Sequence, residues 1–182
     1  MKIIAVGGEP GSGKSTLMKE ILSGLDKYVP LKCYDSFKLV PYIQCGSIYI
    51  LGKYDEGEVF SGTDRMSMAV QPEAIKFLAS LSPDSIVLFE GDRLFTSSFL
   101  EHCVENYDTE ILYLETDKSV RQERYKERGS EQNETWLQGR ETKIANILSN
   151  MTLMFNTSKY KNNNKDEQNV IVDHILTALE AK

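Results

Sequence analysis

A stretch of nine residues near the start of the chain combines glycines, one lysine and hydroxyl side chains. It reads Gly8-Glu9-Pro10-Gly11-Ser12-Gly13-Lys14-Ser15-Thr16. It matches the pattern G-x-x-x-x-G-K-[ST], in which glycines let backbone N–H groups curl around phosphate oxygens. Lys14 is expected to reach the β- and γ-phosphates of a nucleotide and to be catalytic, and the Ser15 hydroxyl is expected to ligate Mg²⁺. The residues predicted to bind ATP in this loop are Gly8, Gly11, Ser12, Gly13, Lys14, Ser15 and Thr16.

The segments on either side of this motif are those that a phosphate-binding loop requires. Residues 2–6 are apolar and rich in branched side chains, as in a buried parallel strand. Leu17, Ile21 and Leu25 recur every four residues, as on the buried face of a helix. The N-terminus of that helix adds a partial positive charge beside the phosphates. This context favours a phosphate-binding loop over a glycine-rich turn with a chance Lys-Ser pair after it.

Acidic side chains follow two further predicted strands, at the edge where ligands bind to open parallel sheets. Asp35 ends the strand 31–35. It is a candidate catalytic base for an attacking hydroxyl, or alternatively an N-cap for the turn that follows. Glu90 ends the apolar strand 86–90, where a buried carboxylate requires a cation. That cation is either Mg²⁺ held by the loop, which would make Glu90 a metal ligand, or a neighbouring lysine or arginine.

Asp92 and Arg93 come directly after Glu90 and its strand. Asp92 is suited to share the metal or the role of base, and Arg93 to bind substrate or to pair with Asp92. The sequence does not separate these alternatives, and we predict that both residues contact the substrate.

Arg121, Arg124 and Arg128 are spaced three and four residues apart on a predicted helix that begins after Asp117, so their guanidinium groups emerge from one side. Three arginines on one face suit phosphate binding, and in phosphoryl transfer such arginines stabilise charge on the transferring group. We predict that Arg121 contacts the nucleotide and that Arg124 and Arg128 are catalytic. The alternative is a solvated helix face that glutamates of the same helix neutralise.

The chain as a whole alternates strands and helices, which indicates an α/β fold with a parallel sheet in a single domain over residues 1–182. Residues 42–65 interrupt this alternation and are interpreted as a hairpin-like insertion, with a turn at 55–57 and a return strand at 59–60. Arg65 lies where an acceptor would approach, so it is a candidate substrate ligand or a structural residue. The other predicted strands are 110–115 and 151–155, and the other predicted helices are 72–81, 98–106, 136–148 and 170–179.

The composition limits the kinds of partner. The net charge is −6, which argues against a broad surface that coats nucleic acid but not against a local basic groove. The three cysteines, Cys33, Cys45 and Cys103, are widely spaced and suggest reduced thiols rather than a zinc site or a disulfide framework. No apolar run is long enough for a membrane helix, and the first strand begins at once, so we expect a cytoplasmic protein without a signal peptide or membrane partner.

These residues together resemble the P-loop kinase group that includes nucleoside monophosphate kinases and polynucleotide kinases. The resemblance covers essentially the whole chain. It rests on the P-loop and on the pattern Leu114…Arg121…Arg124…Arg128, in which a strand is followed by an arginine-bearing lid helix. It implies a five-stranded parallel sheet in the order 2-3-1-4-5, a helical lid at about 117–140, and ATP with Mg²⁺. It also implies that a late loop, around residues 156–158, packs near the adenine.

Within that group, Asp35 resembles the catalytic aspartate of polynucleotide 5′-hydroxyl kinases. The stretch 62–67 with Gln71-Pro72 is similar to phage-type kinases that phosphorylate hydroxymethyluracil in DNA. The chain departs from the group in having Glu90-Gly91-Asp92 instead of a hydrophobic-Asp ending, and it lacks the Asp-Arg-[Tyr/His] signature of thymidylate kinases.

The sequence therefore predicts an ATP-dependent kinase that transfers the γ-phosphoryl group to a hydroxyl of a nucleotide or DNA acceptor. The alternatives are a deoxynucleoside monophosphate kinase and a P-loop ATPase or switch that is not a kinase. The oligomeric state is not predicted.

Overall fold

The computed structural model describes residues 1–27, 31–55, 61–127, 129 and 133–180, except for the side chains of residues 35 and 36. The strands are β1 (Lys2–Gly8), β2 (Lys32–Phe37), β3 (Val40–Cys45), β4 (Ile48–Leu51), β5 (Ile86–Glu90), β6 (Asp108–Glu115) and β7 (Thr157–Lys161). The α-helices are α1 (Lys14–Asp26), α2 (Val70–Ser80), α3 (Ser97–Asn106), α4 (Lys118–Glu127), α5 (Glu134–Leu148) and α6 (Lys165–Glu180). Two short 3₁₀ helices, η1 (Thr63–Arg65) and η2 (Met154–Asn156), complete the described elements.

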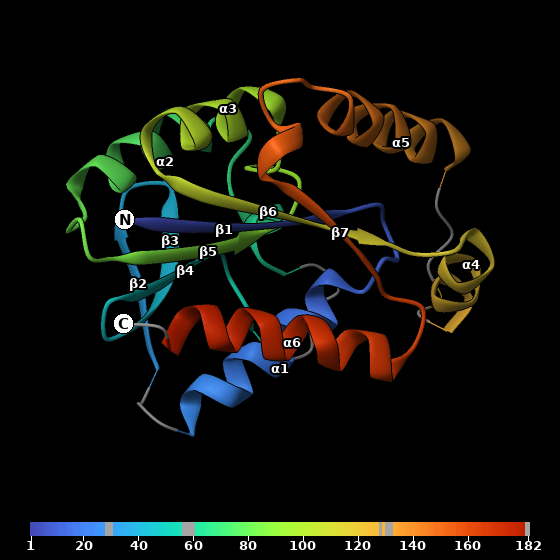
Figure 1. Cartoon of the computed structure of the whole chain (residues 1–182), viewed down its shortest axis with the longest axis horizontal. Helices are drawn as coiled ribbons and strands as arrows, with labels where there is room; N and C mark the ends of the chain where they lie inside the picture. The colour runs from blue at the N-terminus through green and yellow to red at the C-terminus, as the bar shows by residue number, and fades with distance from the viewer. Residues whose placement is uncertain (28–30, 56–60, 128, 130–132, 181–182) are drawn as a thin grey trace.

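The sheet is flanked by helices on both faces, which confirms the predicted α/β class (Figure 1). Its strand order is β2-β3-β4-β5-β1-β6-β7 in the described part of the chain. The strands β4, β5, β1, β6 and β7 are parallel, whereas β2 and β3 are joined to them by antiparallel pairing. The parallel part, β4-β5-β1-β6-β7, reproduces the expected order 2-3-1-4-5, and β4 takes the place of the expected strand 2.

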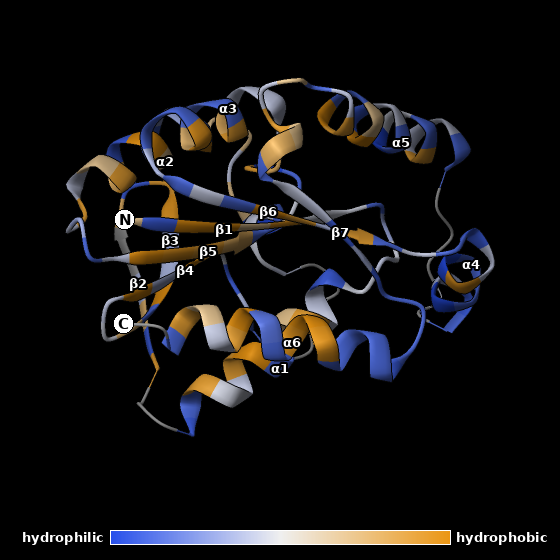
Figure 2. Cartoon of the chain, viewed as in Figure 1, coloured by the Kyte–Doolittle hydropathy of each residue, from blue (hydrophilic) through white to orange (hydrophobic). Residues whose placement is uncertain are grey.

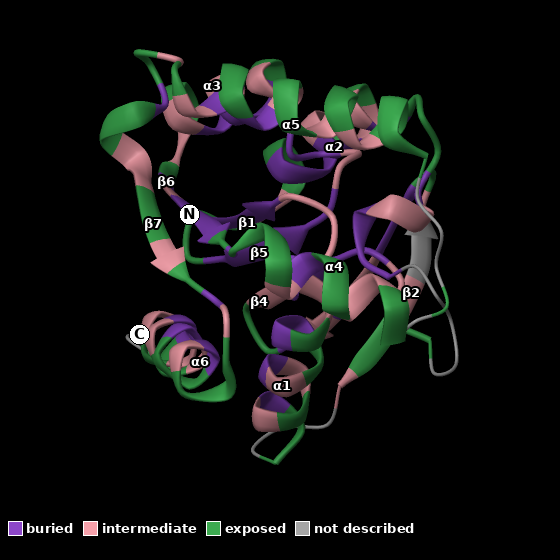
Figure 3. Ribbon diagram, turned by 90° about the vertical axis from the view of Figure 1, so that its right-hand side faces the viewer, coloured by how far each residue is buried: buried purple, intermediate pink, exposed green. Residues whose placement is uncertain are grey.

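The helices bury two separate apolar cores against the sheet. α1 and α6 cover one face, and α2, α3 and α5 cover the other (Figure 1). The central strands β1 and β5 are hydrophobic along most of their length, and α4 is largely hydrophilic (Figure 2). β1 and β5 are buried on both faces, as expected of strands in the middle of a parallel sheet (Figure 3). α4 lies at the end of the sheet where these strands finish, within the segment predicted to form a lid (Figure 1).

The predicted position of the second strand is wrong. β2 contains residue 35 as expected, but it lies at the edge of the sheet, and three strands separate it from β1. The reason is that residues 40–51 form a tight hairpin of β3 and β4, with a two-residue turn at Gly46-Ser47. β4 then pairs in parallel with β5 and takes the expected place. The predicted return strand at 59–60 lies outside the described residues, as does most of the predicted turn at 55–57.

The predicted fifth strand, 151–155, is also wrong. That segment ends in η2, and its side chains Met151 and Phe155 are 78% and 88% exposed. The strand β7 follows it, and its sequence Thr-Ser-Lys-Tyr-Lys is polar because an edge strand buries little of its surface. The apolar residues at 151–155 therefore predicted a strand where the structure has no strand. The polar sequence of β7 did not indicate the strand that is present. Among the described residues, no helix combines the length and hydropathy of a membrane span.

Candidate active site

The loop between β1 and α1 has the backbone conformation of a phosphate-binding loop. Gly13 caps α1 with φ +90°, in the left-handed region that favours glycine. A Cβ atom at this position would lie 2.6 Å from the Asn162 amide nitrogen. The loop therefore needs glycine both for its backbone angle and for the close approach of a neighbouring side chain.

Each carbonyl oxygen from Gly8 to Ser12 accepts a hydrogen bond from a side chain. Lys14 Nζ donates to the first two, at 2.9 and 3.2 Å. The Tyr125 hydroxyl donates to Pro10, Arg124 Nη1 donates to Gly11 at 3.1 Å, and Asn162 Nδ2 donates to Ser12 at 2.7 Å. Because these donors bind the carbonyl oxygens, the partial negative charges of the loop are not directed at a bound anion. This arrangement suits phosphate.

The hydroxyl residues of the loop differ in burial. Ser12 is fully buried, and its Oγ has no hydrogen-bond partner among the described residues. Ser15 is partly buried and Thr16 is exposed, both in the first turn of α1. A buried hydroxyl without a partner is costly, so an incoming phosphate oxygen is a natural partner for Ser12.

Glu90 stands at the end of β5 and is 1% exposed. Burial raises the pKa of its carboxyl to about 8, the nearby Lys14 ammonium lowers it, and the Asp64 charge raises it. Ser61 Oγ donates a long hydrogen bond of 3.4 Å to Glu90. Within the described ranges Glu90 has no ion pair, so the predicted alternative of a lysine or arginine bridge is not found there. The carboxylate together with Ser15 matches the oxygen ligands that Mg²⁺ prefers.

Asp64 joins this group from η1, and the sequence analysis did not assign it a role. Its Oδ1 accepts a hydrogen bond of 2.6 Å from the Asp92 backbone N–H. Burial and the Asp92 charge raise the pKa of Asp64, whereas the Lys14 charge lowers it. Two carboxyl groups, Glu90 and Asp64, therefore interact with the charge of the P-loop lysine.

Helix α4, which is predicted to be part of a lid, packs directly on the P-loop, in front of the central strands (Figure 3). Arg121 Nη1 lies 2.9 Å from the Glu9 carboxylate, and its side chain is 11% exposed. Arg124 reaches beyond the loop and donates to the carbonyl oxygens of Asn162 and Asn163, at 2.9 and 3.3 Å. The prediction that these two arginines emerge from one side of the helix is confirmed, and both meet the P-loop region.

A family model described as P-loop Nucleotide Kinase3 matches residues 1–177. The chain belongs to this family. The predicted nucleotide-binding P-loop and the kinase-like fold are therefore those of a known group of P-loop nucleotide kinases.

One solved structure agrees with the P-loop Nucleotide Kinase3 assignment at the level of the fold. A gluconokinase from Sinorhizobium meliloti 1021 is similar with a TM-score of 0.51 and 16% identity, over 98% of this chain and 95% of that chain. A shikimate kinase from Bacteroides thetaiotaomicron is similar with a TM-score of 0.41 and 16% identity, over 98% of both chains. A comparison with curated protein sequences gives no significant match.

The three residues predicted to contact the substrate form ion pairs or hydrogen bonds with other residues of this chain. Asp92 pairs with Arg140 and lies 3.6 Å from Lys143 Nζ, both on α5. Arg93 Nε donates to the Met66 carbonyl at 3.3 Å, so Arg93 does not pair with Asp92 among the described contacts. The third, Arg65, forms an ion pair with the Asp55 carboxylate. Asp92 and its α5 partners adjoin the Asp64 carboxyl, whereas Arg65 faces the segment after β4.

The remaining predicted residues fall elsewhere. The side chain of Asp35 and the whole of Arg128 lie outside the described residues. The backbone of residue 35 belongs to the edge strand β2, whereas Asp35 was expected to follow the strand next to β5. The strand next to β5 is β4, so residues 52–55 lie where Asp35 was expected. Residues 156–158, predicted to be a late loop near the adenine, instead end η2 and begin β7, because β7 begins six residues later than predicted. The late loop that reaches the P-loop region is at residues 162–163.

Proposed function

We propose that this chain is an ATP-dependent kinase that transfers the γ-phosphoryl group to a hydroxyl of a nucleotide or nucleic-acid acceptor. The observation that carries the proposal is the pair of carboxyl groups, the buried Glu90 and the partly buried Asp64, that both interact with the Lys14 charge of the P-loop. A P-loop alone serves any nucleotide hydrolase, but two carboxyls with raised pKa values suit metal binding and proton transfer in one site.

The P-loop would hold the phosphates, with Lys14 leaving the Gly8 and Glu9 carbonyls for the β- and γ-phosphate oxygens. Ser15 and Glu90 would hold Mg²⁺. When bound, this ion neutralises the charge that develops on the phosphate oxygens. The same ion would remove the cost of ionising a carboxyl that is fully buried at the end of β5.

Asp64 is the better placed base in this proposal. An acceptor hydroxyl oxygen attacks the γ-phosphorus and forms a new oxygen–phosphorus bond, and the bond to the bridging oxygen of ADP breaks. The hydroxyl proton passes to the Asp64 carboxylate. A carboxyl whose pKa is raised accepts a proton more readily near neutral pH than an ordinary one does. Asp35 stays a candidate for the base only if the acceptor approaches from the edge of the sheet where β2 lies.

Arg124 has a position that serves both the fold and the reaction. Its guanidinium fixes the Gly11 carbonyl and the 162–163 loop, which keeps the P-loop in shape. We propose that it also neutralises charge on the transferring group, together with Arg128 of the same helix, and that Arg121 supports nucleotide binding through Glu9.

The test is a transfer assay with γ-labelled ATP and Mg²⁺ in the cytoplasmic pH range, where we place the reaction. Separate reactions receive pools of nucleosides, nucleoside monophosphates, sugar acids and single-stranded DNA, with and without 5-hydroxymethyluracil. We expect label in the nucleoside or DNA pools. Label confined to sugar acids, or release of inorganic phosphate alone, would contradict the proposal.

A second candidate is a deoxynucleoside monophosphate kinase, and Arg140 and Lys143 favour it. Two cations meet at Asp92, and burial lowers the pKa of Lys143. A phosphate acceptor needs such cations and no base. Label in the monophosphate pool alone, as a nucleoside diphosphate product, would select this candidate.

A further inference from the structure

One side of helix α5 carries an aromatic ring and two cations. Trp136, Arg140 and Lys143 are spaced four and three residues apart, so their side chains lie on one side of the helix, and we call these three residues the α5 face. The Arg140 guanidinium carbon lies over the Trp136 ring, 5.0 Å from its centroid. Trp136 is 37% exposed, and the side chains of Arg140 and Lys143 are 24% and 25% exposed. A ligand can therefore reach all three.

The α5 face holds more positive than negative charge. Asp92 forms an ion pair with Arg140, and its Oδ1 lies 3.6 Å from Lys143 Nζ, so two cations share one carboxylate. The acidic residues of the same helix, Glu134 and Glu141, belong to another side of it. At 3.6 residues per turn they lie about 100° or more around the helix axis from each residue of the α5 face. An anionic ligand therefore fits this face.

Asp92 joins the α5 face to the proposed base by direct contacts. Lys143 Nζ donates a hydrogen bond of 2.7 Å to the Asp92 carbonyl oxygen. The backbone N–H of Asp92 in turn donates a hydrogen bond of 2.6 Å to Asp64 Oδ1. Figure 1 shows that α5 begins on the side of the molecule where α4 lies, at the end of the sheet where the central strands finish. A molecule that places a hydroxyl at Asp64 can therefore continue along α5.

The length of the α5 face favours a strand over a single nucleotide. Trp136 and Lys143 are seven residues apart, which is about 10.5 Å along a helix at 1.5 Å per residue. Phosphates follow one another about every 3.4 Å along one strand of helical DNA, so this length corresponds to about three nucleotides. A nucleoside monophosphate with its hydroxyl at Asp64 would have to span Asp92 and Arg140 to reach the Trp136 ring. A free nucleoside has no phosphate for the two cations.

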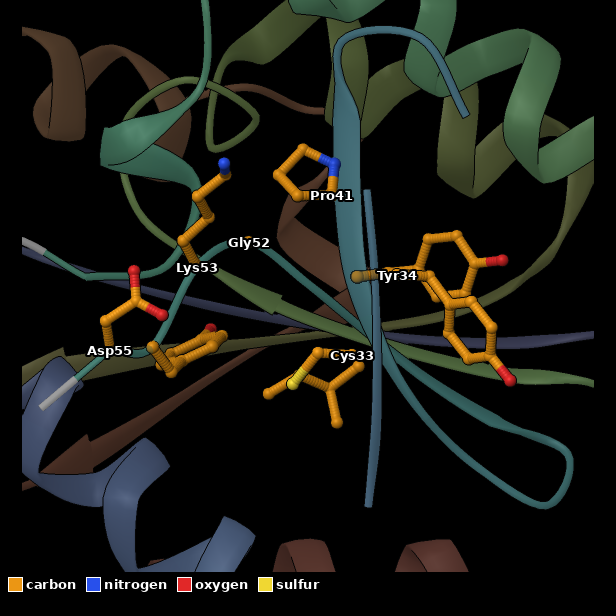
Figure 4. Close-up of a pocket in the computed structure, with 9 residues that line it drawn as sticks. Cys33, Tyr34, Pro41, Gly52, Lys53 and Asp55 are labelled. Carbon is orange, nitrogen blue, oxygen red and sulfur yellow. The ribbon is translucent and has the colours of Figure 1, made fainter. Parts of the chain in front are cut away.

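The pocket at the β2 edge of the sheet is a separate surface. It has a volume of about 160 Å³ and lies between β2, β3 and residues 52–55 (Figure 4). Among the described residues that line it, none belongs to α5, and neither Asp64 nor Asp92 is present. Its Asp55 carboxylate is paired with Arg65. The α5 face, in contrast, meets the active-site carboxyl groups through Asp92.

We infer that the α5 face binds the single-stranded nucleic acid that carries the acceptor hydroxyl. One base stacks on Trp136, and phosphodiester groups bind Arg140 and Lys143. Proteins hold single strands by this combination of aromatic stacking with cations along the backbone. The inference rests on the proposed function for its use in catalysis, whereas strand binding itself can be measured without ATP and without transfer.

The first experiment uses the fluorescence of Trp136, which is the only tryptophan of the chain and therefore reports on the α5 face alone. The wild-type protein is titrated with a short oligothymidylate in the absence of ATP. We expect the strand to quench the emission with saturation. Thymidine, thymidine monophosphate and inorganic polyphosphate, at the same concentration of bases or phosphates, should leave it nearly unchanged. No quenching by the strand, or equal quenching by the monophosphate or the polyphosphate, would overturn the inference.

The second experiment measures the affinity for a fluorescein-labelled strand by anisotropy. Trp136→Ala should weaken binding on the order of tenfold, as loss of a stacking ring does. Its matched control is Phe155→Ala, which removes an exposed aromatic ring from η2, beyond the other end of α5. Arg140→Gln should also weaken binding and should reduce the slope of log affinity against log salt by about 0.7, the value for one phosphate contact on a single strand. Lys19→Gln removes an exposed cation from α1 and is its control.

The controls should bind the strand as the wild type does. Unchanged affinity in folded Trp136→Ala and Arg140→Gln proteins, or losses equal to those of the controls, would overturn the inference. The titration of the wild type decides alone if the variants do not fold. Strand binding that depends on these two residues, without phosphoryl transfer, contradicts only the kinase function. Transfer to a strand whose binding ignores both residues contradicts only the role of the α5 face.

Discussion

Glu9 of the P-loop and Arg121 of the lid helix α4 form an ion pair in which both side chains are largely buried. The distance from Glu9 Oε2 to Arg121 Nη1 is 2.9 Å, and the exposed fractions are 17% and 11%. The same guanidinium lies 3.7 Å from the Glu141 carboxylate on α5. One arginine therefore joins the phosphate-binding loop to both helices that follow β6, and it ties the position of the lid to the state of the loop.

Removing the charge of Glu9 should loosen the lid. We expect Glu9→Gln to cost about 1–3 kcal/mol in the free energy of unfolding, because the Arg121 charge keeps its burial and loses its main partner. Amide hydrogen exchange should speed up in α4 more than in α6. The control is Glu123→Gln, an exposed position on α4 that should change stability by less than about 0.5 kcal/mol. Equal exchange rates in α4 for both variants would show that the pair does not hold the lid.

Lys14→Ala should reduce phosphoryl transfer by at least about 10²–10³-fold, since the ammonium is the P-loop cation expected at the transferring phosphate. The chain should stay folded, because Lys14 contacts loop carbonyls and not the core. Turnover with labelled ATP and circular dichroism measure the two effects, and Lys19→Ala, exposed on α1, is the matched control. Near-normal transfer by folded Lys14→Ala would refute the assignment of the site.

Glu90 should make stability depend on pH. Its pKa is about 8 in the folded chain and near 4.5 when unfolded, so the neutral carboxyl is favoured by folding. The stability that it contributes is complete below about pH 4.5 and is lost as the pH rises through about 8. Glu90→Gln, which stays neutral, should be more stable than wild type above pH 8 without Mg²⁺, on the order of 1.4 kcal/mol for each pKa unit of the shift.

Thermal unfolding at pH 5, 7 and 9 measures this effect. Mg²⁺ should stabilise the wild type increasingly as the pH rises, because binding requires the ionised carboxylate. The Glu90→Gln variant should lose this response. Parallel pH profiles for the two proteins would be inconsistent with a buried, protonated Glu90.

How far the sequence predicts this site depends on how local each contact is. Residues 8–16 and their flanking strand and helix are specified by neighbours in the chain, so the P-loop was placed correctly. β7 escaped prediction because an edge strand has no need of apolar residues. Asp64 was not assigned because it meets Asp92 across 28 positions of sequence, and no spacing rule connects them. The predicted position of Asp35 next to β5 was wrong for a related reason. The pairing of β3 with β4, which no local sequence pattern reveals, decides which strand adjoins β5.

Asp64 and Asp35 can be separated by matched substitutions. Asp64→Asn should lower transfer about 10²-fold or more with ATP binding unchanged, as loss of a general base does. Asp35→Asn should lower it by much less, because its strand lies at the edge of the sheet. The measurement is kcat at saturating acceptor, together with ATP affinity from fluorescence titration. The reverse order of effects would restore Asp35 as the base.

The central claim is that the acceptor group is a hydroxyl, and the product of the reaction tests it most directly. We would convert the acceptor found in the transfer assay with unlabelled ATP and record the ³¹P NMR spectrum of the purified product. The account predicts a new phosphomonoester signal, from a phosphorus bound to carbon through oxygen, without coupling to a second phosphorus. Two coupled phosphorus signals would reveal a diphosphate, which would contradict a hydroxyl acceptor and the role of Asp64 as base.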